Sequence, residues 1–199
     1  QELTKRLGLY TSLRSQGRWY DSASSAVWQI TERNINIIRV SGRWLHLPIR
    51  QHWEIRLKEG GVIELEITLK VDREIEVDRL QTNLMLSENY SEWIANSNKG
   101  IFPQFNGDID DDWEVLWSNS SHKDKKKDYI GLLKNSIDNA SFPKIIFLPE
   151  DIDSGWSLNI VNSDLYHRGR VLQYLKNEKQ ILSPGEYRCF RGSIKIEES

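Results

Sequence analysis

A two-residue rhythm of apolar and polar side chains runs through residues 43–71, and it constrains the fold more than any other feature of the sequence. Most odd positions in this stretch are aliphatic or tryptophan up to residue 71, and most even positions are polar or charged. Successive side chains of a strand point to opposite faces of its sheet, so this rhythm predicts strands with one apolar face. The Glu59-Gly60-Gly61 segment interrupts it, and glycine adopts positive φ at low cost. The stretch therefore predicts a long antiparallel hairpin.

The same alternation predicts a register for this hairpin. If Leu57 pairs with Ile63, then Arg56 stands opposite Glu64 on the polar face. Pro48 has no N–H to donate, so it predicts a break or bulge in the first strand. Trp53 shares its parity with the aliphatic residues and is predicted to lie in the core.

Further alternating segments predict strands along the rest of the chain. A phase slip near Asp78 indicates a β-bulge between residues 75–77 and 80–86. The remaining candidates are 26–30, 34–40, 113–117, 144–148, 156–161, 170–175 and 186–196. About ten strands predict an all-β fold, a large antiparallel two-sheet β-sandwich. At most one short helix is expected, near residues 125–137, where Gly131 weakens the helical pattern.

Length and composition are those of a soluble globular domain. The 199 residues are 38% hydrophobic and 28% charged. A net charge of -2 argues against a nucleic-acid partner, and no apolar stretch approaches a membrane span. No linker divides the chain, which begins with Gln1, so we expect residues 1–199 to be a single domain excised from a longer protein. The compartment stays open.

Two segments resemble the galactose mutarotase-like domains, the β-supersandwich of sugar epimerases and of accessory domains in glycoside hydrolases. One is residues 47–65, a long strand, a glycine turn and a second strand; the other is Leu-Ser-Pro-Gly-Glu-Tyr at residues 182–187. The resemblance implies a carbohydrate-linked role. The enzymes of that family use a histidine and a glutamate around the sugar ring, and residues 155–161, where the glutamate is expected, contain none. This departure favours a binding or accessory role over catalysis.

The polar positions of the predicted hairpin form one candidate ligand face. Sugar rings stack on aromatic side chains, and their hydroxyls pair with planar polar groups. Such a face is expected to contain Trp44, His46, Arg50, His52 and Glu54. The alternative, which the alternation slightly favours, is an ordinary solvated outer face of a sheet.

A second candidate site combines aromatic residues and acids in predicted loops. Its members are Tyr90, Trp93, Trp113, Asp110, Asp111 and Glu114. Trp93 and Trp113 are predicted to stack on a sugar while Asp110 accepts hydrogen bonds from its hydroxyls. A pair of carboxylates can also act as acid and base in glycoside cleavage, for which Asp111 and Glu114 are the candidates. The alternative is a solvated acidic loop whose aromatic rings fold back onto the core.

Metal and cofactor chemistry receives little support. Asp108, Asp110 and Asp112 alternate in a way that suits calcium, but the order of an EF-hand loop is absent. The four histidines show no zinc-binding spacing. Cys189, the single cysteine, lies in a predicted strand and is expected to be a buried structural thiol. No cofactor is expected.

Three functional hypotheses follow. The leading one is a non-catalytic carbohydrate-binding or accessory domain of a larger carbohydrate-active or polysaccharide-biosynthesis protein. It would bind a glycan or pack against an adjacent catalytic domain. The second is a sugar-acting enzyme, such as an epimerase, lyase or glycoside hydrolase, and the third is a structural or protein-interaction sandwich.

Overall fold

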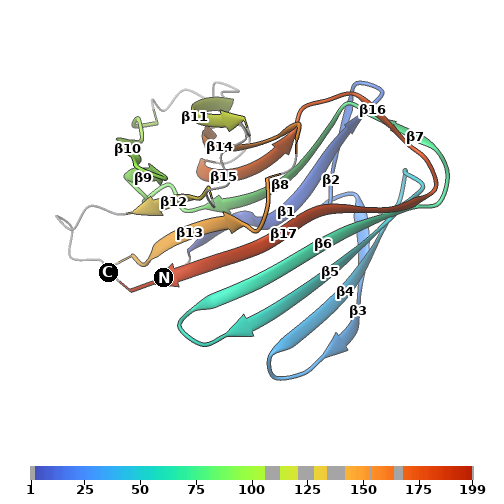
Figure 1. Ribbon diagram of the computed structural model, residues 1–199, viewed down its shortest axis with the longest axis horizontal. Helices are drawn as coiled ribbons and strands as arrows, with labels where there is room; N and C mark the ends of the chain where they lie inside the picture. Colours follow the sequence, from blue (N-terminus) through green and yellow to red (C-terminus); the bar gives the residue numbers. More distant parts are fainter. Residues whose placement is uncertain are drawn as a thin grey trace.

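The computed structural model describes residues 3–105, 113–120, 128–133, 142–152, 154–163 and 168–198. These residues form strands and no helix (Figure 1). Two large antiparallel sheets, one of six strands and one of nine, pack face to face, and a two-stranded sheet lies beside them. The predicted all-β two-sheet sandwich is confirmed. No helix in the described part of the chain is long and apolar enough to cross a membrane.

The larger sheet has nine strands in an order that differs strongly from the order of the sequence. Across this sheet they are β10 (Asn98–Ile101), β9 (Glu92–Ala95), β12 (Ile130–Leu133), β13 (Lys144–Pro149), β17 (Gly185–Glu197), β6 (Val62–Val71), β5 (Ile49–Lys58), β4 (Ile37–Trp44) and β3 (Ala26–Arg33). The C-terminal strand β17 therefore lies between β13 and β6 and joins the two halves of the sheet.

In Figure 1 the smaller sheet lies above strands β17, β6, β5, β4 and β3 of the larger one. Its order is β11 (Trp113–Ser120), β14 (Trp156–Ser163), β15 (Gly169–Lys176), β8 (Arg79–Leu86), β1 (Thr4–Ser15) and β2 (Arg18–Asp21). The two-stranded sheet pairs β16 (Gln180–Leu182) with β7 (Ile75–Val77).

The predicted register of the β5–β6 hairpin is confirmed. Leu57 pairs with Ile63 and Arg56 with Glu64. Gly60 and Gly61, in the connecting turn, both have φ near +71°, which explains the glycines there.

The predicted first strand of this hairpin is wrong at its beginning, because the chain reverses where Pro48 interrupts the pattern. Residues 45–48 form the turn between β4 and β5, so Trp44 ends one strand and Ile49 begins the next. The phase slip near Asp78 also marks a change of sheet rather than a bulge. Before it, β7 pairs with β16, and after it, β8 enters the six-stranded sheet.

The helix expected near residues 125–137 is not found where the structure describes that range. Residues 130–133 form β12, paired with β9 and β13 on its two sides. Ile130 and Leu132 are fully buried, and Gly131 lies so close to the backbone that an added Cβ would be 2.5 Å from the Ile145 carbonyl oxygen. Residues 125–127 and 134–137 lie outside the described residues.

The hydrophobic core fills the space between the two large sheets. Leu13, Leu84 and Leu172 contribute from the six-stranded sheet, and Leu69 and Phe147 from the nine-stranded sheet. The predictions for Trp53 and Cys189 are confirmed, since their exposed fractions are 8% and 1%. The turns of the β3–β4 and β5–β6 hairpins project away from the six-stranded sheet (Figure 1), and the apolar side chains of Leu57 and Ile30 near these turns are exposed.

Candidate functional site

Charged side chains line up across the outer face of the nine-stranded sheet. Pairing between strands places Glu66 of β6 beside Glu54 of β5 on one side and Arg191 of β17 on the other. The next row along places Glu64 between Arg56 and Ser193. These residues face outward because their neighbours Leu65 and Ile67 are buried on the core side.

A groove of about 470 Å³ lies over these rows, and we call it the charged groove. Its charged lining residues are Glu54, Arg56, Lys58, Glu64, Glu66, Glu150 and Arg191. The volume lies within the roughly 300–1,000 Å³ that small-ligand sites occupy. Its described lining residues include no aromatic ring. A ligand would therefore be held there by hydrogen bonds and charge.

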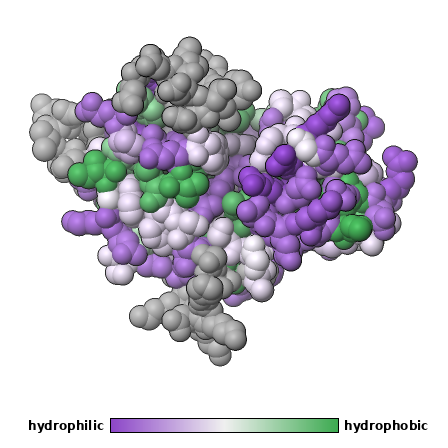
Figure 2. Space-filling view, turned by 90° about the horizontal axis from the view of Figure 1, so that it is seen from above, coloured by the Kyte–Doolittle hydropathy of each residue, from purple (hydrophilic) through white to green (hydrophobic). Residues whose placement is uncertain are grey.

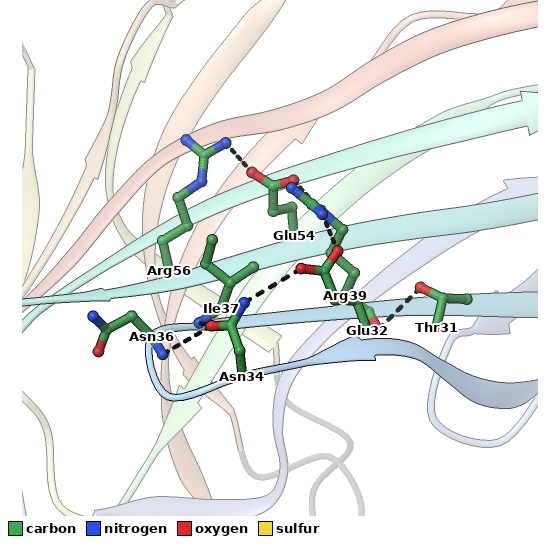
Figure 3. A network of polar contacts seen from close by, with 8 residues as sticks. All are labelled: Thr31, Glu32, Asn34, Asn36, Ile37, Arg39, Glu54 and Arg56. Carbon is green, nitrogen blue, oxygen red and sulfur yellow. Dashed lines mark hydrogen bonds and ion pairs between the residues drawn. The ribbon is translucent and has the colours of Figure 1, made fainter.

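A network of ion pairs orders one end of the charged groove (Figure 3). Arg39 of β4 lies between two carboxylates, with its Nε 2.5 Å from Glu54 Oε2 and its Nη1 paired with Glu32. Arg56 pairs with the other oxygen of Glu54. The hydrogen bond from Arg39 lowers the pKa of Glu54, so this carboxylate stays ionised. Asn34 fixes the nearby turn by accepting the Ile37 N–H at 2.8 Å.

Glu66 differs from the other acids of the charged groove. Lys58 Nζ approaches Glu64 at 3.3 Å, and Arg191 Nε lies 2.6 Å from Glu150 Oε2. The Glu66 carboxylate, by contrast, has no hydrogen bond or ion pair within the described residues. Like charges directly opposite each other in a sheet are destabilising, so the Glu54–Glu66 pair costs stability. A half-buried acceptor is thereby left free in the middle of the groove.

The structure separates the members of the first predicted ligand face. Glu54 lines the charged groove and His52 lies exposed on the same outer face. His46 is exposed in the turn after β4, and Arg50 is engaged with Asp72, with Nη2–Oδ1 at 2.7 Å. Placing Trp44 on this face is wrong. Trp44 is only 3% exposed and packs into the core, because the turn at residues 45–48 breaks the parity that linked it to His52.

The aromatic residues of the second predicted site do not come together as a stacking platform. Tyr90 is fully buried, and its hydroxyl donates to the Pro143 carbonyl oxygen at 2.9 Å. Burial raises the pKa of Tyr90 to about 12. Trp93 lies on β9 of the nine-stranded sheet, half-buried over Gly100, whereas Trp113 lies on β11 of the other sheet.

The acids of that site are mostly outside the region described. Glu114 is exposed on β11. Four other acids lie outside the described residues: Asp108, Asp110, Asp111 and Asp112. The predictions of calcium binding and of carboxylate catalysis depend on these acids and stay predictions. Among the residues that are described, no cluster of three or more His, Cys, Asp or Glu side chains could hold a metal ion.

A row of hydrogen-bonded polar side chains, which sequence analysis missed, crosses the outer face of the six-stranded sheet. Ser118 Oγ donates to Asn159 Oδ1 at 2.6 Å, and Asn159 Nδ2 donates to Gln173 Oε1 at 2.8 Å. Gln173 Nε2 then donates to Gln81 Oε1 at 2.8 Å, and Gln81 Nε2 to Ser12 Oγ at 2.5 Å. We call this chain through β11, β14, β15, β8 and β1 the amide row. Each residue is unremarkable within its own strand, so only the pairing of the strands reveals the row.

No protein-family model matches this sequence, and no curated protein matches it closely enough to count as a relative. The class of protein is therefore defined by the structure itself. It is an antiparallel two-sheet β-sandwich, with the charged groove on the nine-stranded sheet and the amide row on the six-stranded sheet.

Proposed function

We propose that this chain is a non-catalytic carbohydrate-binding or accessory domain of a larger carbohydrate-active protein, with a galactose mutarotase-like supersandwich fold. The charged groove would bind the glycan. The observation that carries this proposal is the free Glu66 carboxylate in a groove whose remaining charges are held in place by ion pairs.

The chemistry of the groove suits a polyhydroxylated ligand. A sugar hydroxyl can donate one hydrogen bond and accept others. Glu66 and Glu64 supply acceptors, while Arg56 and Arg191 supply planar sets of donors. All four lie on β5, β6 or β17, and side chains held on paired strands lose little conformational freedom on binding.

A glycan titration of Glu66→Gln tests this function. This variant keeps the size of the side chain, but it removes the negative charge and replaces one acceptor oxygen by an amide donor. We expect a panel of oligosaccharides, screened by calorimetry and by amide chemical shifts, to identify a ligand of the unaltered protein. Glu66→Gln should bind that ligand with a Kd about tenfold higher, the usual effect of losing one charge-assisted hydrogen bond. Glu74→Gln, at an exposed position beyond β6, is the matched control and should bind normally.

Two results would count against the proposal. One is that no glycan perturbs the residues of the charged groove, and the other is that Glu66→Gln binds as tightly as the unaltered protein. Turnover in an anomeric-exchange or reducing-sugar assay would instead favour the enzyme hypothesis, with Asp111 and Glu114 as the first residues to replace.

A second function, packing against an adjacent catalytic domain, is favoured by the uncovered end of the nine-stranded sheet. Leu57 is 46% exposed and Ile30 57%, and both lie on the side of the sheet that forms the core elsewhere. Apolar side chains grouped at a surface are typical of interfaces. If this end is covered in the larger protein, amides of residues 55–64 will exchange with deuterium more slowly there than in the 199-residue chain. Equal exchange rates would remove this candidate.

A further inference from the structure

Two arginines stand opposite each other at one end of the six-stranded sheet. Arg14 of β1 and Arg79 of β8 are paired across the strands, and both point outward because Leu13 and Leu80 are buried on the core side. Opposed like charges are unfavourable unless an anion lies between them. Neither guanidinium has a carboxylate partner in the part of the chain that is described, and Arg14 Nε is buried without a hydrogen bond.

The carboxylates nearest in sequence and pairing are engaged elsewhere. Asp21 accepts the Ser24 N–H at 2.7 Å and the Ser24 hydroxyl at 2.5 Å, which closes the turn after β2. Glu76 pairs with Lys179 at 2.9 Å. Asp78 accepts the Gly17 N–H at 3.4 Å. The positive charge of the arginine pair is therefore left for an anion from outside the described residues.

The amide row ends beside this pair and adds a donor. Ser12 precedes Arg14 by two residues, so its side chain lies on the same outer face. Its oxygen accepts from Gln81 Nε2 at 2.5 Å and from Asn83 Nδ2 at 3.5 Å. Because both amides donate to Ser12, the serine hydroxyl can still donate its own proton, and a bound anion would supply an acceptor.

An exposed aromatic ring completes the arrangement. Trp19 of the edge strand β2 is paired with Arg14 and is 49% exposed. The adjoining part of the molecule, near β7 and β16, lies on the right in Figure 1, and the same side is predominantly hydrophilic when seen from above in Figure 2. An exposed indole ring beside cationic groups offers an apolar face on which a sugar ring can stack.

We infer that Arg14, Arg79, Ser12 and Trp19 form a second ligand site, which binds an acidic saccharide unit. The arginines and the serine hydroxyl hold its anionic substituent, a carboxylate or a sulfate, and the sugar ring lies against Trp19. This site is on the opposite sheet from the charged groove. It rests on the proposed function only for the choice of a saccharide as the ligand.

Side-chain Nε–Hε resonances of arginine provide the test, with four probes titrated separately. They are an oligogalacturonate, a sulfated oligosaccharide, a neutral cello-oligosaccharide and inorganic sulfate. We expect Arg14 and Arg79 to respond to the anionic probes, with at least tenfold weaker binding of the neutral one. The first two probes show which anionic substituent is preferred. Trp19→Ala should weaken saccharide binding about tenfold and leave the response to inorganic sulfate unchanged.

Matched variants separate this site from general charge attraction. Arg79→Gln should abolish binding of the preferred probe, whereas Arg73→Gln, at an exposed turn position, removes the same charge and should not. Equal losses in both variants, no response to any anionic probe, or a response to inorganic sulfate alone would overturn the inference. Arg14→Gln should abolish binding in the same way, and if that variant does not fold, Arg79→Gln still decides. Glu66→Gln should leave this site intact, so failure of the charged groove and failure of this site are distinguishable.

Discussion

Gln51 of β5 and Thr11 of β1 hydrogen-bond to each other across the interface of the two sheets, and neither side chain has any exposed surface. Thr11 Oγ1 lies 2.9 Å from Gln51 Oε1 and 2.7 Å from Gln51 Nε2. Trp53 Nε1 also donates to Gln51 Oε1 at 3.1 Å. One polar cluster thereby fixes the position of one sheet on the other inside an otherwise apolar core.

Replacing Gln51 by leucine should destabilise the fold through the groups left behind. Thr11 and Trp53 would each lose a partner, and a buried unsatisfied polar group costs about 1–3 kcal/mol. The combined variant with Thr11→Val and Gln51→Leu should lose less free energy of unfolding than the sum of the single variants, as urea denaturation can measure. Strict additivity would show that the two side chains do not stabilise each other.

Arg170 is a buried cation held by two aromatic rings. It is 4% exposed, with its Cζ 4.5 Å from the ring centre of Phe102 and 4.3 Å from that of Phe105. Its Nε donates to the Tyr90 carbonyl oxygen at 3.2 Å, and burial lowers its pKa to about 10.

Arg170→Met keeps an apolar chain but removes these contacts. It should lower the free energy of unfolding by about 2–3 kcal/mol, because hydrogen bonds of charged groups are among the stronger ones. Thermal or urea unfolding measures this, and Arg73→Met at an exposed turn is the control. A change in the free energy of unfolding of less than about 0.5 kcal/mol, the usual range for surface substitutions, would mean that the contacts of Arg170 with Phe102, Phe105 and Tyr90 do not stabilise the fold.

The ion pairs around Glu54 should make stability depend on acid pH. The folded state lowers the pKa of Glu54, chiefly through the hydrogen bond from Arg39. The resulting stabilisation is present above the usual glutamate pKa of about 4.3 and is lost as the pH falls through the lower folded value.

Arg39→Gln should therefore raise the pKa of Glu54, seen as a shifted carboxyl titration by NMR. Its cost in stability should be small near neutral pH, since the side chains are partly exposed and water screens their charges, and it should vanish in acid. An unchanged titration of Glu54 would show that Arg39 does not hold this carboxylate in solution.

Cys189 offers a probe of global unfolding. It is 1% exposed, and burial raises the pKa of its thiol, so little thiolate forms in the folded protein. A disulfide reagent should label it at the rate of unfolding, and the rate should rise steeply with urea. Rapid labelling under native conditions would indicate local opening of β17.

The sequence alone determined features that depend on residues close together in the chain, such as the register of one hairpin and the burial of single side chains. The alternation on both sides of Gly60 and Gly61 predicted the Leu57–Ile63 pairing, because a tight turn and a two-residue period fix the register of neighbouring segments. The burial of Trp53 followed from the same parity, and the burial of Cys189 followed from the usual behaviour of a lone thiol in a predicted strand. By the same reasoning, the wrong placement of Trp44 came from extending one strand's parity through a turn.

Tertiary structure alone decided what depends on strands distant in sequence. The segment 130–133 became a strand because β9 and β13 offered hydrogen-bonding edges on both sides, which outweighed its helical spacing. Glu66 and Arg191 became neighbours through the pairing of β6 with β17, and the amide row through the pairing of five strands. Side chains alternate along each strand, which the sequence displays, but strands are ordered across a sheet by the packing of the whole core, which no local pattern encodes.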